Sequence, residues 1–331
     1  MNQFFIGFVA MLVFANGLRA QTNLAAPDIG TTASSTNDVA QQELDKVMSD
    51  DDAAMDEINR WINENAAFDS HGAGESKEQL NARIQARLKA VRQNYDNYLV
   101  RFPTNAPAYL AYGSFLDEIG DDDGAYAKYE KGRELDPSNP AAWNDLANYY
   151  GENGPVTNAF AYYTKASELD PIEPVYYENF ATTVYLFRKD AEEFYNINEA
   201  QVFDKSLALY RKAIKLDPDN FTLQTDYAES YYGIKPLRTN DALEAWTNAL
   251  KVAHTDLERQ GVYIHLARIK IAAGRYAEAQ AHLDAVTNAV DADLKKRLER
   301  NLREREAAVT NAPADLEMST NLPVASSQKM P

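Results

Sequence analysis

Three stretches of the chain end in the same phrase, Leu-Asp-Pro: YEKGRELDPSN at residues 129–139, YTKASELDPIE at 163–173 and YRKAIKLDPDN at 210–220. Proline has no backbone N–H and clashes with the preceding helical turn, so each phrase predicts the end of a helix. Pro137 and Pro171 lie 34 residues apart. Pro218 follows Pro171 by 47 residues, which is one period of 34 with 13 residues added. The spacing therefore predicts repeated helical units that join at these phrases.

The segment 140–173 shows the fullest pattern within one period. It places an aromatic residue early, then a Leu-small pair, then small and aromatic residues before the proline: Trp143, Leu146, Ala147, Tyr150, Ala159, Tyr163, Ala166 and Pro171. This pattern resembles the tetratricopeptide repeat, and related copies extend the resemblance over about residues 91–291. The resemblance implies an all-α fold, a right-handed α-solenoid of stacked antiparallel helix pairs. Trp143 is expected to be buried between the helices of its repeat.

The repeat register divides the chain into segments. We expect a signal peptide at 1–20, a flexible linker at 21–37, an N-terminal helical segment at 38–75, an N-terminal capping helix or degenerate repeat at 76–105, five repeats at 106–139, 140–173, 174–220, 221–256 and 257–291, a C-terminal capping helix at 292–309 and a disordered tail at 310–331.

Two segments depart from the regular repeat. Thirteen extra residues, 188–200, fall inside the third repeat, and the aromatic residues around them predict that its first helix runs about two turns beyond the usual length. Asn198 and Gln201 are spaced to cap the next helix. In the C-terminal helix, Lys295–Glu299, Glu299–Arg303 and Arg300–Glu304 are spaced to form ion pairs.

The first twenty residues contain an apolar run, residues 4–15, which is too short to span a bilayer as a helix. A run of this length followed by Leu18 and Ala20 is typical of a cleaved secretory signal. We therefore expect an exported protein, periplasmic or secreted, whose mature chain begins near Gln21 and does not insert into a membrane.

Composition and motifs narrow the class of function. The formal net charge of −17 argues against nucleic acid as a partner, because phosphate binding requires a basic surface. The chain has no cysteine, which excludes disulfides and thiolate catalysis. We find no phosphate-binding loop, nucleophile elbow or zinc-binding histidine pair. We therefore expect no enzyme activity, no catalytic residue, no cofactor and no metal.

The resemblance also implies where a partner would bind. In tetratricopeptide repeats, the first helices line a concave groove that holds a peptide or a segment of another protein. The groove positions that we expect to bind are Asn144, Asp145, Asn148, Glu178, Asn179, Thr182, Tyr185, Asp226, Glu229 and Tyr232. Equivalent positions hold Ser114, Asp117, Glu118, Glu152, His265 and Arg268.

Such a groove is acidic and rich in asparagine, so the expected partner is another protein or peptide with a basic or amide-rich contact segment. The alternative is a structural or assembly protein that meets its partner through the insert of the third repeat or through the C-terminal helix. The sequence does not determine the oligomeric state.

Overall fold

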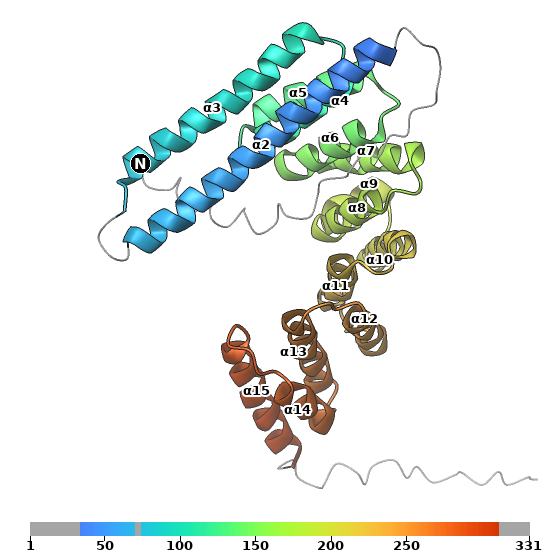
Figure 1. Cartoon of the computed structure of the whole chain (residues 1–331). Coiled ribbons are helices and arrows are strands. Elements are labelled where there is room, and N and C mark those ends of the chain that lie inside the picture. The colour runs from blue at the N-terminus through green and yellow to red at the C-terminus, as the bar shows by residue number, and fades with distance from the viewer. Residues whose placement is uncertain (1–33, 70–73, 311–331) are drawn as a thin grey trace, which may run out of the picture. The chain divides into compact units, whose positions relative to one another are not determined.

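The computed structural model describes residues 34–69 and 74–310, and every regular element in these ranges is a helix (Figure 1). The expected signal peptide, the tail from residue 311 and most of the expected linker lie outside the described residues. The rest forms two compact units, which divide between Leu216 and Asp217. The all-α fold of stacked helix pairs is confirmed.

The helices of the first unit are α2 (Ser34–Asp69), α3 (Lys77–Arg101), α4 (Ala106–Glu118), α5 (Asp122–Leu135), α6 (Pro140–Asn153), α7 (Val156–Leu169), α8 (Pro174–Leu186), α9 (Arg188–Tyr195) and α10 (Glu199–Leu216). The second unit contains α11 (Phe221–Ser230), the short 3₁₀ helix η2 (Tyr231–Gly233), α12 (Thr239–Lys251), α13 (Asp256–Ala272), α14 (Tyr276–Asp284) and α15 (Ala292–Thr310).

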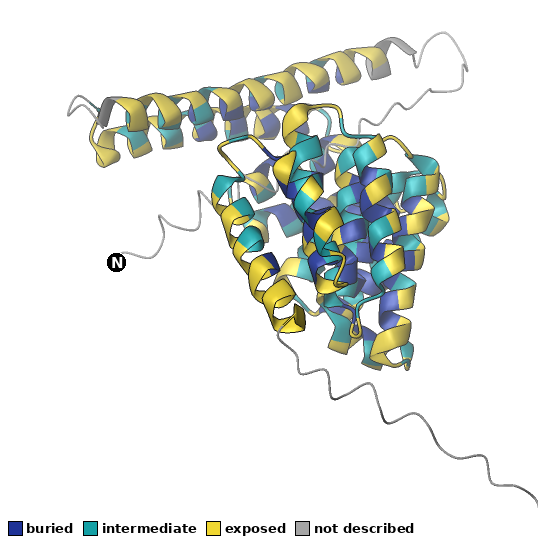
Figure 2. Cartoon of the chain, turned by 90° about the horizontal axis from the view of Figure 1, so that it is seen from below, coloured by how far each residue is buried: buried dark blue, intermediate teal, exposed yellow. Residues whose placement is uncertain are grey.

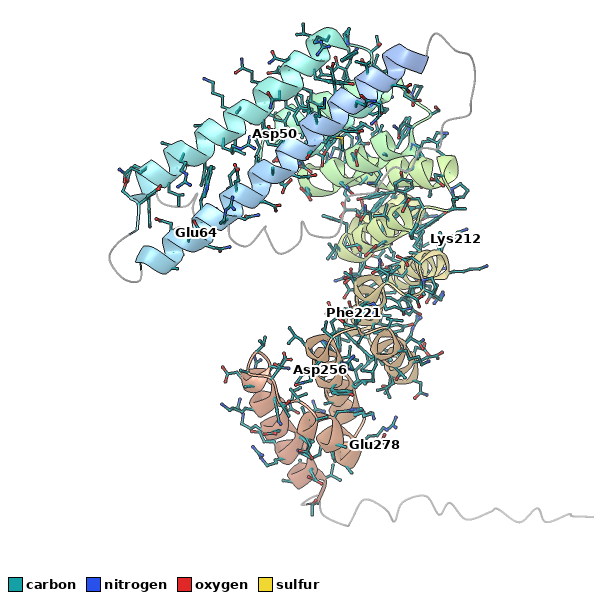
Figure 3. All side chains as sticks on the ribbon, in the orientation of Figure 1. Asp50, Glu64, Lys212, Phe221, Asp256 and Glu278 are labelled. Atoms are coloured by element: carbon teal, nitrogen blue, oxygen red, sulfur yellow. The ribbon has the colours of Figure 1, made fainter. Side chains whose placement is uncertain are left out.

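The first unit opens with a long hairpin of α2 and α3. The helix α2 begins at Ser34, inside the predicted linker. On the side of α2 that faces α3, Asp50 accepts hydrogen bonds from Arg87 at 2.8 Å and from Asn94 at 2.9 Å (Figure 3). The Tyr95 hydroxyl donates to Asp51 at 2.9 Å in the interior of the hairpin. Side-chain hydrogen bonds thus fix the register of α2 against α3, and apolar residues of the two helices also pack together.

The Leu-Asp-Pro phrases form the joints between helix pairs. The Asp136 N–H donates to the Gly132 carbonyl and ends α5, while the Asp136 carboxylate accepts the Ser138 N–H at 3.1 Å. Asn139 then caps α6 by accepting the Ala141 N–H at 3.0 Å, and Pro140 occupies the first turn, where no N–H is needed. One phrase therefore ends one helix and begins the next.

Small residues allow the two helices of a pair to pack closely. A Cβ atom on Gly113 of α4 would lie 2.5 Å from ring atoms of Tyr129 on α5, closer than real atoms approach. The buried residues lie on the sides of the helices that face one another, and the exposed residues lie outside (Figure 2). The pattern residues Ala147, Ala159, Tyr163 and Ala166 are buried as the repeat predicts.

Two expectations about the repeats are wrong. Trp143 is only partly buried, because its indole N–H reaches out to the Pro137 carbonyl at 2.9 Å across the joint. The first helix of the third repeat is not lengthened. It ends at Leu186, and the insert forms the separate helix α9.

The break before α9 lets its aromatic residues turn back onto the unit. The Phe160 ring on α7 lies 5.4 Å from the Phe194 ring and 5.6 Å from the Tyr195 ring, measured between centroids. The predicted cap of the following helix is confirmed: Gln201 N–H donates to the Asn198 side chain, and Asn198 N–H donates to Gln201, both at 3.0 Å. The insert therefore packs as part of the unit.

Candidate functional site

Polar residues from three neighbouring helices gather in the first unit, where α6 packs against both α4 and α8. We call this surface the acidic face. Its members are joined by hydrogen bonds or by electrostatic contact: Asp117, Asn144, Asp145, Asn148, Glu152 and Asn179. They occupy the positions that the repeat pattern assigns to the inner side of each first helix.

The asparagines of the acidic face bind neighbouring side chains. The Asn179 side chain on α8 donates to Asn144 Oδ1 at 3.1 Å, and Asn144 Nδ2 donates to the Asp145 carboxylate at 3.4 Å. The Tyr163 hydroxyl donates to the Asn148 side chain at 2.6 Å. Asn144 is buried, with 5 % of its surface exposed. These amides therefore hold α6 in place between its neighbours, and Asn144 is not available to a partner's backbone as the sequence suggested.

The carboxyl groups of the acidic face have raised pKa values. Burial, followed by the charge of Glu152, raises the pKa of Asp117 to about 6. Burial raises the pKa of Asp145 to about 7, the hydrogen bond from Asn144 opposes this increase, and the charge of Asp117 adds a smaller increase. The pKa of Glu152 is also raised, although its side chain reaches the surface. Among the described residues, no salt bridge joins any of the three to a cation.

Tyrosines from the second helices complete the acidic face. Burial, followed by the negative charges of Asp145, Asp117 and Glu152, raises the pKa of the Tyr129 hydroxyl on α5. Tyr163 of α7 is likewise buried. The repeat pattern marks both tyrosines as packing residues, and it carries no signal that their hydroxyls reach the polar surface.

The remaining predicted residues of the first unit lie along α8. Glu178 and Asn179 are half-buried neighbours. Thr182 shares a hydrogen bond of 2.8 Å with the Tyr210 hydroxyl of α10. The Tyr185 ring packs against Phe203, and the Arg188 guanidinium lies 5.3 Å from the Tyr185 ring centre. Thr182 and Tyr185 are therefore engaged with α10 and the start of the insert.

The predicted residues of the second unit form a separate cluster. Asp226 and Glu229 lie on α11, but Tyr232 lies in the 3₁₀ turn η2, beyond the end of that helix. The Tyr232 hydroxyl is 3.0 Å from His265 Nδ1, and the Arg268 guanidinium lies 4.4 Å from the Tyr232 ring centre. Burial, followed by the charge of Glu229, raises the pKa of Asp226 to about 6.

Across 34–69 and 74–310, no three side chains of histidine, aspartate or glutamate lie close enough together to hold a metal ion. Within the same ranges, no helix combines the length and the apolar character that a membrane-spanning segment requires.

Comparison with known proteins agrees with this architecture. Residues 140–173 match the tetratricopeptide repeat family model, which confirms the predicted tetratricopeptide repeat over this segment. No curated protein matches the chain.

Among solved structures, YrrB is described as a tetratricopeptide repeat protein with an unusual peptide-binding site. It is 14 % identical to this chain, and the match covers 62 % of this chain and 97 % of YrrB with a TM-score of 0.47. The pilF protein of Pseudomonas aeruginosa is 19 % identical, over 62 % of this chain and 87 % of that one, with a TM-score of 0.46. A thermophilic tetratricopeptide repeat protein of Thermus thermophilus, TTC0263, is 21 % identical, over 60 % and 99 %, with a TM-score of 0.42.

Proposed function

We propose that this protein is a non-enzymatic scaffold whose acidic face binds a basic or amide-rich segment of another protein. The observation that carries the proposal is the pair Asp117 and Asp145, two recessed carboxyl groups on adjacent helices that form no salt bridge with any cation in the part of the chain that the structure describes. Like charges held together oppose ionisation, and a bound cation relieves that repulsion. A lysine or arginine side chain is the group that this surface lacks.

The charge, the hydrogen-bonding groups and the rigid helices of the acidic face also suit a peptide. Glu152 at its edge and Glu178 on α8 extend the negative charge along successive repeats. The amides of Asn148 and Asn179 keep hydrogen-bonding capacity beyond the single bond that each makes within the unit. Helix pairs fixed by capped joints hold these groups in position, which lowers the entropy lost on binding.

The direct test is the affinity of a labelled basic peptide of about 12 residues, in which lysines alternate with asparagine and serine. We call it the basic probe. The double variant Asp117→Asn and Asp145→Asn keeps side-chain shape while removing the charge, and it is expected to weaken binding about tenfold or more. Fluorescence anisotropy measures the change.

The matched control neutralises two carboxylates on second helices, Glu134→Gln and Glu168→Gln, whose side chains are 58 % and 62 % exposed. This control is expected to bind the basic probe as the parent does. Equal losses in both double variants would show only a response to overall charge and would contradict the proposal, as would full affinity in the Asp117/Asp145 variant.

Proton release provides an independent test. A bound cation favours the ionised carboxylates, so binding near neutral pH should expel protons from Asp117 and Asp145, whose pKa values are about 6 and about 7. Calorimetry in buffers of different ionisation enthalpy measures the number of protons released. Heats that do not depend on the buffer would place the ligand away from these two groups.

We further propose that the chain is exported, on the strength of the apolar run at residues 4–15. The mature protein is expected to begin near Gln21 and to be recovered outside the cytoplasm. N-terminal sequencing of the natural protein decides this, and a chain that still begins at Met1 would refute it.

A further inference from the structure

A pocket of a different character lies in the second unit, between α13 and α15. It has a volume of about 490 Å³, within the range of ligand-binding cavities. Its walls combine apolar side chains with arginines and belong to two helices that pack against each other. Two of the groove positions expected from the sequence, His265 and Arg268, are among its lining residues.

The charged groups of this pocket are mainly arginines. Arg268 comes from α13, and Arg297, Arg300 and Arg305 come from α15, with Glu304 as the one acid among the lining residues. Within the described residues, Arg297, Arg300 and Arg305 form no salt bridge, and the predicted pair between Arg300 and Glu304 is not made.

The base of the pocket is apolar. Ile264 and Ile271 of α13 are nearly fully buried at 2 % and 3 % exposure. On α15, Leu298 is partly buried, while Leu294 lies 39 % exposed at the rim. An apolar residue of a ligand would therefore contact isoleucine and leucine, and its charged neighbours would lie beside the arginines.

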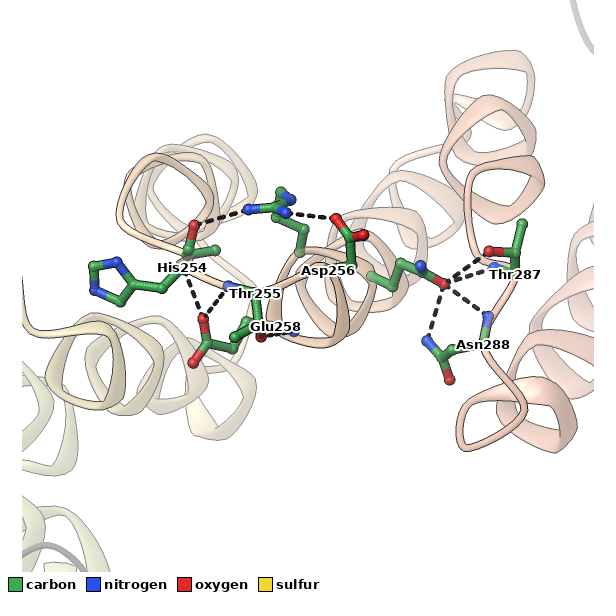
Figure 4. Close-up of polar contacts among 9 residues, drawn as sticks. His254, Thr255, Asp256, Glu258, Thr287 and Asn288 are labelled. Carbon is green, nitrogen blue, oxygen red and sulfur yellow. Dashed lines mark hydrogen bonds and ion pairs between the residues drawn. The ribbon is translucent and has the colours of Figure 1, made fainter.

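Hydrogen bonds hold the two walls of the pocket in position. Gln260 of α13 accepts the backbone N–H groups of Thr287 and Asn288 at 2.7 and 2.8 Å, which ties the segment before α15 to α13 (Figure 4). Thr255 and Glu258 form a capping box that fixes the start of α13 in the same region. The pocket is thus built on an anchored framework.

A neutral histidine borders the arginines. The His265 ring stacks on Trp246 with centroids 4.0 Å apart and meets the Tyr232 hydroxyl at 3.0 Å. Burial, followed by the charge of Arg268, lowers the pKa of His265 to about 4. The positive charge of the pocket therefore comes from guanidinium groups, which stay ionised at every ordinary pH.

We infer that this pocket binds an acidic amphipathic peptide segment of a partner protein, with its leucine-like side chains on the isoleucine base and its carboxylates on the arginines. We call the surface the arginine pocket.

The distribution of charge favours a peptide over a smaller anion. The arginines of α15 extend from residue 297 to 305, a distance of about 12 Å at 1.5 Å per residue. A fatty acid or a single phosphate would reach one or two of them. A segment with carboxylates at successive turns and apolar residues between them matches both the spacing and the base, and it complements the charge.

The experiment uses a fluorescein-labelled helical peptide of about 14 residues, in which glutamates flank leucines three and four positions apart. We call it the acidic probe. The full chain is expected to bind it, and Arg297→Glu with Arg305→Glu should weaken binding by about tenfold or more. Both arginines are exposed, so the fold should be kept. Replacing the glutamates of the probe by glutamine, or its leucines by serine, should weaken its binding to the parent chain by a similar factor.

The matched control is Lys296→Glu with Arg303→Glu, which changes the charge of the same helix equally at exposed positions outside the pocket. It is expected to bind the acidic probe as the parent does. Equal weakening in the control, or no binding by the full chain, would overturn the inference.

Competition identifies the occupant. Octanoate or a single-stranded oligonucleotide could displace the acidic probe at concentrations at which the unlabelled acidic peptide does not. That result would show that the pocket binds this other ligand and would overturn the inference. Tighter probe binding by a chain that ends at Thr310 would instead assign the pocket to residues 311–331 of the same chain. If the chain self-associates in sedimentation experiments and the acidic probe disrupts that self-association, the occupant of the pocket is a second copy of the chain.

Discussion

The acidic face of the first unit and the arginine pocket of the second are built from equivalent parts and have opposite charge. Each lies on helices that pack against each other, and in each one helix begins with a capping side chain, Asn139 before α6 and Thr255 before α13. The acidic face presents recessed carboxyl groups that no salt bridge among the described residues joins to a cation, whereas the arginine pocket is lined by four arginines and one acid, Glu304. The difference shows that the repeat fixes which positions face a ligand and leaves their chemistry open.

The two units also differ in how they use their tryptophans, and this gives the largest expected effect. Trp246 of the second unit is 1 % exposed, so Trp246→Ala should lower the free energy of unfolding by about 3–5 kcal/mol. Trp143 of the first unit is partly exposed, and Trp143→Ala should lower it by about 1–2 kcal/mol. Urea unfolding followed by circular dichroism measures both, and a larger loss from Trp143 would reverse the comparison.

The acidic face should make the stability of its unit depend on pH. The folded state binds protons more tightly than the unfolded state, because the pKa values of Asp117 and Asp145 are raised to about 6 and about 7. The free energy of unfolding should therefore fall as pH rises from about 4 to about 7. At about pH 8, Asp117→Asn with Asp145→Asn should raise it by an amount on the order of 1–3 kcal/mol.

Unfolding of parent and variant at a series of pH values checks this prediction. A parent curve that stays flat across that range, or a variant that keeps the full slope of the parent, would show that the two carboxyl groups ionise normally in the folded chain.

The arginine pocket should depend on the anchor that Gln260 provides. Gln260→Ala removes the acceptor of the Thr287 and Asn288 N–H groups and should cost about 1–2 kcal/mol of stability. It should also weaken binding of the acidic probe about threefold or more, because α15 is then held less firmly. Gln280→Ala is the control, since Gln280 bonds only within its own helix. Unchanged probe affinity in the Gln260 variant would mean that the walls are held by apolar packing alone.

The smallest expected effect is a test of independence. The Asp117/Asp145 variant should bind the acidic probe within about twofold of the parent, and the Arg297/Arg305 variant should do the same for the basic probe. Anisotropy titrations of each variant with the opposite probe measure this. Strong cross-effects would mean that the two surfaces act as one site.

Much of the fold was predictable because local rules decide it. Proline positions, capping asparagines and small residues at helix contacts act over a few residues, so the joints at Pro137 and Pro171 are readable in the sequence. The candidate site was only partly predictable. The register places Asp145 and Asn179 on the inner side, but it does not show that Asn179 bonds to Asn144.

The sequence by itself determined the period, the helix boundaries near each phrase and the acidic character of the inner positions, because these depend on residue type and spacing. Three features became visible only in the folded chain: the insert forms a separate helix, the Trp143 indole N–H donates to the Pro137 carbonyl, and the arginines of α15 meet Arg268 of α13 around an apolar base. These features arise from contacts between segments far apart in the chain, and the burial and charge created by such contacts cannot be assigned to any residue until its neighbours are in place.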